Sequence, residues 1–285
     1  MKLGVAGLLP GDWRKIDREV TQKVRNAGFI GAQLFINRPL EAQNTDIQRV
    51  KDAYDASGLE VAQVNGWYEA LVNPDDALRA QGVLGLQALA RIARQVNAPT
   101  TYVRPGGLNP NGHWYAHPDN HSPATFERLV DSLKQVTVVA EREGMLLAIE
   151  GHVLSVLDTP QRVRDLLDAV ASPALKFNTD PVNFYGSVRD VHDTRPVLNQ
   201  LFDLLGADTV VGHAKDLALQ DSLVVHIQEV IIGSGTLDYD LFLKRFQAYC
   251  PDAYLLIEHL PDEKVPLARQ ALLQKAGEVG VKISR

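Results

Sequence analysis

The strongest constraint on the fold is an eightfold alternation of short apolar runs with longer amphipathic segments. The runs are short, apolar and bounded by Gly, Pro or polar residues, as is typical of strands buried in a parallel sheet. Eight rather evenly spaced units of this kind favour a closed (β/α)8 barrel, or TIM barrel, over an open doubly wound sheet. The apolar runs occupy residues 3–8, 30–35, 59–64, 100–105, 145–150, 175–180, 209–214 and 253–258.

The segments between these runs have helical periodicity and recognisable ends. Asn73, Ser122 and Thr159 each precede a proline, and a capping residue followed by proline is typical of a helix start. Glycines 28, 58, 144, 206 and 277 follow helical segments, where a left-handed cap favours glycine. The clearest helices are predicted at residues 16–27, 46–56, 74–95, 122–143, 159–170 and 261–276.

Length and composition place the chain among ordinary globular proteins. It has 285 residues, 45% of them hydrophobic and 22% charged, with a net charge of −6. We find no linker of low complexity, so we expect one α/β domain over residues 1–285. The lack of a basic stripe argues against a nucleic-acid partner, and no apolar stretch of about 18 residues indicates a membrane span.

Cysteine content and the N-terminal sequence bear on the compartment. Cys250 is the one cysteine of the sequence, so an intramolecular disulfide is excluded. The apolar stretch before Pro10 is shorter than a signal peptide requires. These features lead us to expect a cytoplasmic protein.

Four consecutive strand ends in the second half of the chain carry side chains that can bind a metal ion. They are Glu150, Asp180, His213 and Glu258. A single acidic residue at a strand end is more often a helix cap or an ion-pair partner, but four in succession converge on one point of a barrel. Without a cation such groups would repel one another or shift their pKa values. Three carboxylates and one imidazole suit one divalent ion, Mn²⁺ first, then Mg²⁺ or Co²⁺, with Zn²⁺ left open.

The same regions carry a specific family resemblance. The chain resembles the xylose-isomerase-like TIM-barrel superfamily over nearly its whole length, in particular the sugar phosphate isomerase/epimerase group. The resemblance implies that the four strand-end residues form the metal site. The matching motifs are AIEGH (148–152), TDPVN (179–183), GHAKD (212–216), IIGSGTLDY (231–239) and LIEH (256–259).

Two positions depart from the pattern of that family. Asn183 stands where many members carry a histidine, and asparagine cannot act as an acid or a base near neutral pH. Near the strand-seven histidine, where many epimerases carry an arginine, the nearest polar residues are Lys215 and Asp216. Lys215 is a candidate to bind a substrate oxygen or to pair with Glu258 or Asp216.

The resemblance implies an isomerase or epimerase that acts on a sugar, a keto-sugar or a related polyol carbonyl through an enediolate. Glu150 and Glu258 would remove and return the proton next to the carbonyl. The alternative is a metal-dependent lyase or dehydratase on a keto-sugar or keto-inositol, which Asn183 keeps open. An abasic-site nuclease would need more histidine ligands and a basic surface, and a non-catalytic barrel would not need the four-residue set. The expected partner is a small carbohydrate, and a homo-oligomer stays open.

Further residues are candidate substrate contacts at the predicted active-site face. They are Asn183, His152, Glu229 and Arg104. Arg104 could clamp a phosphate or a carboxylate, or it could form a salt bridge at the rim of the barrel. Two long segments, 106–121 and 217–239, are predicted as loops on this face. We consider a sugar-stacking or packing role for Trp67 and Tyr68, a substrate lid or a solvated loop for His113, Trp114 and His117, and a place in the seventh loop for His226.

Overall fold

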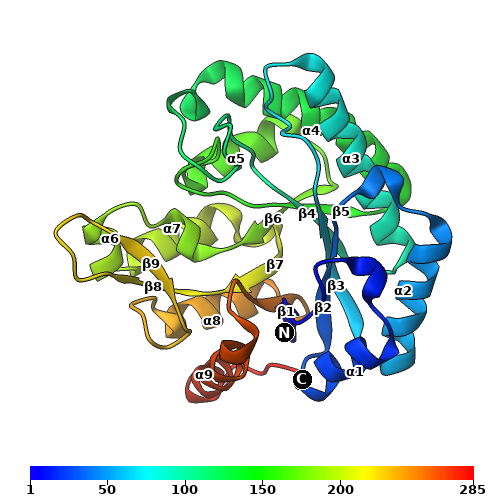
Figure 1. Cartoon of the computed structure of the whole chain (residues 1–285). Coiled ribbons are helices and arrows are strands. Elements are labelled where there is room, and N and C mark those ends of the chain that lie inside the picture. Colours follow the sequence, from blue (N-terminus) through cyan, green and yellow to red (C-terminus); the bar gives the residue numbers. More distant parts are fainter.

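The computed structural model describes residues 1–285 and contains a closed barrel of eight parallel strands (Figure 1). Each strand pairs with its sequence neighbour, and the last closes the barrel by pairing with the first from Lys2↔Tyr254 to Ala6↔Glu258. The predicted (β/α)8 fold is therefore confirmed. The barrel strands are β1 (Lys2–Ala6), β2 (Gly31–Ile36), β3 (Glu60–Gly66), β4 (Thr100–Val103), β5 (Leu146–Ile149), β6 (Leu175–Thr179), β7 (Thr209–Ala214) and β10 (Tyr254–Glu258).

The helices surround the barrel, and all six of the predicted ones are present. They are α1 (Arg18–Asn26), α2 (Asn44–Ser57), α3 (Asp76–Gln95), α4 (Pro123–Glu143), α5 (Pro160–Val170) and α9 (Val265–Glu278). Three more, which the sequence analysis did not name, are α6 (Val188–His192), α7 (Arg195–Leu205) and α8 (Tyr239–Tyr249). Short 3-10 helices lie at Trp13–Lys15, Pro39–Glu41, Pro118–His121, Pro181–Phe184, Gly206–Asp208 and Asp262–Lys264.

Two of the three predicted helix starts are confirmed. The hydroxyls of Ser122 and Thr159 accept hydrogen bonds from the first turns of α4 and α5. The start at Asn73-Pro74 is wrong, because Asp75 caps α3 by accepting hydrogen bonds from the backbone amides of Ala77 and Leu78. Asn73 instead accepts a hydrogen bond from the Asp75 amide in the preceding turn.

Three of the five predicted glycine caps are confirmed. Gly58 and Gly144 end α2 and α4 in the left-handed region, with φ of 67° and 65°, and Gly28 follows α1 with φ of 90°. Gly206 is not such a cap, because its φ is −56° and the chain continues into a 3-10 turn. The cap predicted at Gly277 is also wrong, since this residue lies inside α9.

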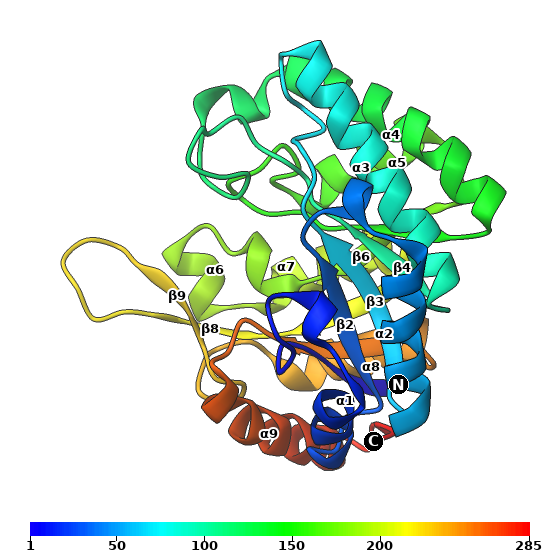
Figure 2. The same ribbon diagram turned by 45° about the vertical axis from the view of Figure 1, so that its right-hand side comes forward.

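The segment 217–239, predicted as a loop, is partly an antiparallel hairpin. Its strands β8 (Asp216–Leu219) and β9 (Ile227–Val230) pair from Asp216↔Val230 to Leu219↔Ile227. Figure 2 shows this hairpin extending away from the barrel. The hairpin follows β7, so it leaves the barrel from the C-terminal ends of the strands.

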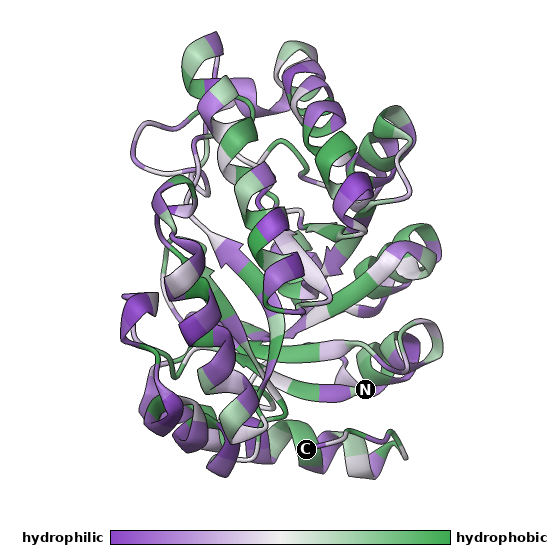
Figure 3. Cartoon of the chain, turned by 90° about the vertical axis from the view of Figure 1, so that its right-hand side faces the viewer, coloured by the Kyte–Doolittle hydropathy of each residue, from purple (hydrophilic) through white to green (hydrophobic).

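The chain ends meet at the opposite side of the barrel. Leu3 donates its amide to Ser284 and Ser284 donates to Met1, with N···O distances of 2.9 and 2.8 Å, and both ends lie together in Figure 1. Figure 3 shows hydrophobic colour on much of the central strands and mixed colour along the surrounding helices. None of these helices combines the length and apolar character that crossing a bilayer requires.

Candidate metal centre

The four predicted metal ligands come together at the C-terminal ends of neighbouring strands. Ligand atoms of Glu150, Asp180 and His213 all lie within 4.8 Å of one another. The Nδ1 atom of His213 is 3.3 Å from a Glu150 oxygen, 3.5 Å from an Asp180 oxygen and 3.0 Å from Oε2 of Glu258. All four side chains are buried. Three carboxylates therefore surround one imidazole nitrogen in the mouth of the barrel.

Lys215 is the fifth buried member of this cluster. Its Nζ atom lies 2.6 Å from Asp180 Oδ2 and 2.7 Å from Glu258 Oε2. Of the two carboxylates proposed as its partner, Glu258 is the one that it contacts. Asp216, one residue further along, points elsewhere and accepts hydrogen bonds from backbone amides. The ammonium group thus offsets part of the negative charge of the three carboxylates.

Burial and mutual charge shift the pKa values in opposite directions within the cluster. Burial raises the pKa of Glu150 to about 7, against the effect of His213. Burial also acts to raise the pKa values of Asp180 and Glu258, but Lys215 and His213 outweigh it and hold both below their ordinary values. The pKa of Lys215 is raised, because its carboxylate neighbours outweigh the effect of burial. Such divergent shifts are typical of functional sites.

The donor set fits a divalent cation. Asp180 is fully buried and its Oδ1 accepts no hydrogen bond, while Nε2 of His213 is also without a partner. A buried charged oxygen without a partner is costly, and a cation removes that cost. Carboxylate oxygens and an imidazole nitrogen are ligands that Mg²⁺, Mn²⁺, Co²⁺ and Zn²⁺ all accept. Glu150, Asp180 and His213 could therefore form a metal site.

Glu150 is held by two hydrogen-bond donors. The side-chain amide of Asn183 donates to Oε1 at 3.0 Å, and the hydroxyl of Tyr102 donates to Oε2. Tyr102 also stacks on the His213 ring, with centroids 6.0 Å apart. Asn183, which stands at the position of the expected histidine, thus orients a carboxylate. Tyr102 was not predicted as a site residue, although it lies two residues before Arg104 and so on the same side of the extended chain.

A ladder of side-chain amides runs through the barrel towards His213. Gln33 donates to Gln63 at 2.8 Å, and Gln63 donates to Asn178 at 3.2 Å. The Asn178 amide nitrogen lies 3.4 Å from Nδ1 of His213. These residues lie on strands β2, β3, β6 and β7. They were not predicted, because the sequence of an apolar run does not show which residue of another strand forms a hydrogen bond with a polar side chain in it.

The remaining candidate contacts lie around the cluster. His152 accepts a hydrogen bond from the Leu154 amide on Nδ1 at 3.1 Å, and burial lowers its pKa. Glu229 does not reach the cluster and instead lies 3.3 Å from Nδ1 of His259. His259 was not singled out, yet its Nε2 is 3.7 Å from Glu258.

Arg104 is positioned by aromatic side chains and a backbone carbonyl. It makes no ion pair, so the rim salt bridge is wrong. Its guanidinium carbon lies 4.5 Å from the Trp67 ring centroid and 4.3 Å from that of Tyr68. It also donates to the Tyr68 carbonyl oxygen at 2.9 Å. Arg104 is 6% exposed and Trp67 is 52% exposed, so the arginine lies beneath an exposed indole.

The segment 106–121 contacts the loops on both sides of it. The His113 ring meets Trp67 edge-on at 6.0 Å, and the next residue, Trp114, meets His152 edge-on at 5.6 Å. Burial, followed by the charge of Arg104, lowers the pKa of His113 to about 4. His117 instead caps the short helix Pro118–His121 by accepting a hydrogen bond from Asp119. His226 closes the β8–β9 hairpin, where its carbonyl accepts a hydrogen bond from the Gln220 amide.

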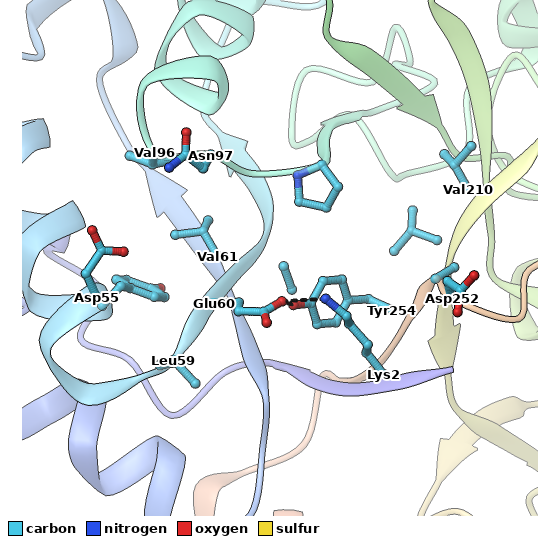
Figure 4. A pocket seen from close by; sticks show the side chains of 15 residues that line it. Lys2, Asp55, Leu59, Glu60, Val61, Val96, Asn97, Val210, Asp252 and Tyr254 are labelled. Carbon is cyan, nitrogen blue, oxygen red and sulfur yellow. Dashed lines mark hydrogen bonds and ion pairs between the residues drawn. The ribbon is translucent and has the colours of Figure 1, made fainter. Parts of the chain in front are cut away.

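A separate cavity of about 400 Å³ lies at the other end of the barrel. Figure 4 shows Lys2, Glu60 and Tyr254 meeting there. Lys2 lies 2.7 Å from Glu60, which also accepts a hydrogen bond from the Tyr254 hydroxyl. None of the predicted site residues lines this cavity. Active sites of TIM-barrel enzymes lie at the C-terminal ends of the strands, so the candidate site is the cluster around His213.

Comparison with family models identifies the class of protein. Residues 21–276 match the model described as the xylose isomerase-like TIM barrel. The chain belongs to this family, as the resemblance of its motifs predicted. No curated protein matches it.

Solved structures similar to this chain include sugar epimerases and a magnesium complex. A 3-keto-D-glucoside 4-epimerase from E. coli has 19% identity and a TM-score of 0.71, covering 98% of this chain and 99% of that one. A D-psicose 3-epimerase determined with D-fructose has 16% identity and a TM-score of 0.73, covering 98% and 100%. A xylose isomerase-like TIM barrel protein from Mycobacterium smegmatis in complex with magnesium has 13% identity and a TM-score of 0.73, covering 98% and 96%. At these identities the likeness establishes the shared fold.

Proposed function

We propose that this protein is a divalent-metal-dependent isomerase or epimerase that acts on a small sugar, keto-sugar or related polyol carbonyl. The observation that carries the proposal is the buried cluster of Glu150, Asp180, His213 and Glu258 around one imidazole nitrogen. Structural neighbours named as sugar epimerases support the same substrate class. The four cluster residues would hold one ion, and the oxygen-rich set favours Mn²⁺, with Mg²⁺, Co²⁺ or Zn²⁺ as alternatives.

In the proposed reaction, one carboxylate acts as the base and another as the acid. A bound divalent ion supplies Lewis-acid polarisation of a substrate oxygen. Glu258, kept charged by the ammonium of Lys215 at 2.7 Å, is the candidate to remove the proton next to the carbonyl. Glu150, oriented by Tyr102 and Asn183, would return a proton to the enediolate from its own side.

A lyase on a keto-sugar or keto-inositol is the second candidate. It begins with the same proton removal, after which a leaving group departs from the adjacent carbon. Asn183 supports this alternative, because its amide contacts Glu150 and cannot donate a proton as an acid. The masses of the products separate the two reactions, since a dehydratase releases water and an isomerase does not.

Metal analysis and deuterium exchange test the proposal together. The purified protein is analysed for bound metal, and keto and aldo sugars are then followed by NMR in D₂O for deuterium entering a carbon position. We expect Glu150→Gln and Glu258→Gln to lower exchange by at least about 100-fold, the contribution typical of a general acid or base. Glu60→Gln is the matched control, because Glu60 pairs with Lys2 in the cavity at the opposite end of the barrel. Wild-type exchange by both site variants contradicts the proposal.

A further inference from the structure

A second cavity of about 400 Å³ lies at the C-terminal ends of β2 and β3, on the same face as the metal-ligand cluster. This volume falls within the range of small-molecule sites. Residues after β2, residues after β3, one side of α3 and His113 line it. The cavity combines the exposed apolar side chains of Leu40, Trp67 and Leu78 with the polar side chains of Asn37 and Gln81.

Trp67 is held in this cavity as a fixed platform. Half of its surface is exposed, which is an unfavourable state for an indole in water. The Arg104 guanidinium lies between Trp67 and Tyr68 and is anchored by its hydrogen bond to the Tyr68 carbonyl. His113 meets the indole edge-on. Contacts of this kind restrict the ring and leave part of it free for a ligand.

Glycines of α3 keep space open next to the platform. A Cβ atom at Gly85, which lines the cavity, would lie 2.7 Å from Cβ of Tyr68. A Cβ atom at Gly82 would collide with the backbone carbonyl of Glu69. Larger residues at these two positions would push α3 outwards or displace the residues that follow Trp67. The close packing of α3 against residues 68 and 69 therefore shapes this cavity.

One polar atom in the cavity wall has no partner. Oδ1 of Asn37 is buried and accepts no hydrogen bond. A buried carbonyl oxygen without a donor is uncommon in folded proteins. A small rotation of the Asn37 side chain would bring this oxygen to a ligand hydroxyl, and the exposed side chain of Gln81 supplies a further polar group on the same wall. An aromatic surface flanked by amide groups matches the apolar ring face and hydroxyl edge of a sugar.

The end of β4 and the loop that follows it contribute residues next to both the cavity and the candidate catalytic site. Tyr102, which donates to Glu150, precedes Arg104 by two residues, so their Cα atoms are about 7 Å apart along the strand. His113 and Trp114 then contact Trp67 and His152 respectively. The same short segment thus borders the platform on one side and the mouth of the metal-ligand cluster on the other.

We propose that this cavity is a subsite for a second sugar ring, stacked on Trp67, so that the substrate class is a glycoside or disaccharide. This inference rests on the proposed function for the identity of the reacting ring, which would lie at the metal-ligand cluster. The neighbouring ring is bound by Trp67, Asn37 and Gln81 and takes no part in the proton transfer. Arg104 supports the platform and is a positioning residue.

Binding measurements test the subsite without relying on turnover. Titration calorimetry with the full-length protein as purified compares D-glucose with maltose and cellobiose. We expect at least one disaccharide to bind about tenfold more tightly than D-glucose, which corresponds to about 1.4 kcal/mol. Trp67→Ala removes this preference and Trp67→Phe retains most of it, because the phenyl ring preserves a stacking surface. Leu267→Ala is the matched control, since Leu267 is an exposed apolar residue of α9 outside this cavity.

A second variant keeps the test independent of any folding defect at position 67. Gln81→Trp fills the cavity from an exposed position of α3, and it should abolish the disaccharide preference while D-glucose binding stays within twofold. Equal affinity of the wild type for all three sugars overturns the subsite, as does a preference that survives both Trp67→Ala and Gln81→Trp. The proposed function fails separately, through absence of deuterium exchange on every sugar. Exchange on monosaccharides without a disaccharide preference leaves that function intact and removes the subsite alone.

Discussion

Replacement of Asp216 should release the segment that follows the β8–β9 hairpin. The buried carboxylate accepts four backbone hydrogen bonds. Oδ1 receives the amides of Leu217 and Leu237 at 2.9 and 3.1 Å, and Oδ2 receives those of Gly233 and Gly235 at 2.9 and 3.0 Å. The side chain therefore links the start of β8 to residues 233–237.

The expected magnitude follows from which of these amides water can reach. Leu217 and Leu237 are buried, whereas Gly233 is exposed and Gly235 is partly exposed. Each buried donor left without a partner costs about 1–3 kcal/mol, so Asp216→Ala should lose about 4 kcal/mol in the free energy of unfolding. In Asp216→Asn the amide oxygen can still accept from the two leucines, and water can serve the glycines. We expect a loss of about 1.5 kcal/mol for that variant.

Urea unfolding followed by circular dichroism measures both losses, and hydrogen exchange of the Leu217 and Leu237 amides shows whether the opening is local. Asp221→Asn is the control, because Asp221 is an exposed carboxylate in the turn of the same hairpin. The reasoning is refuted if Asp216→Ala unfolds within 1 kcal/mol of the wild type with unchanged exchange at both leucines. An Asn variant less stable than the Ala variant contradicts it too.

Three further predictions concern packing, charge and pH. Gly82→Ala should lower the free energy of unfolding in urea by about 1–3 kcal/mol, because the added Cβ meets a backbone carbonyl. Gly277→Ala should raise it by about 0.5–1 kcal/mol, because this position lies inside α9 with open space around it. Equal effects of the two variants would refute this reasoning. Lys215→Met leaves two buried carboxylates uncompensated, so metal-free protein should lose about 3 kcal/mol or more, and added Mn²⁺ should raise its Tm more than that of the wild type. The pKa of His113 falls from 6.5 to about 4 on folding, so the unfolded state binds more protons and stability falls as pH decreases from about 6.5 to 4. His113→Asn should flatten this part of the stability profile, and an unchanged slope counts against the assignment.

Much of the architecture could be predicted from the sequence because its physical origin is local. Apolar runs of strand length can only be buried, and the amphipathic segments between them can only cover them. The period of two along a strand also assigns sides. Lys215 lies two residues after His213 and shares its side of the chain, whereas Asp216 faces the opposite side. The helix starts at Ser122 and Thr159 depend on contacts within one turn, and these were predicted correctly.

Other features depend on contacts that exist only once the barrel closes. The residues that hold Glu150 come from β4 and from the turn after β6, and the amide ladder from Gln33 to Asn178 crosses from β2 to β6. The five residues of α6 are too few for a periodic pattern. Arg104 could equally have faced a phosphate or a carboxylate, and the stacking partners that it has were decided by packing.

The four strand-end residues illustrate the division most clearly. The sequence by itself determined that two glutamates, an aspartate and a histidine lie at or next to the C-terminal ends of four successive barrel strands, which is a matter of residue type and spacing. Only the tertiary structure decided that Lys215 lies between Asp180 and Glu258 and that Glu150 is oriented by Tyr102 and Asn183. Strand spacing is set by the chain, but the angle and depth of each side chain are set by closure of the barrel and by the neighbours that closure provides.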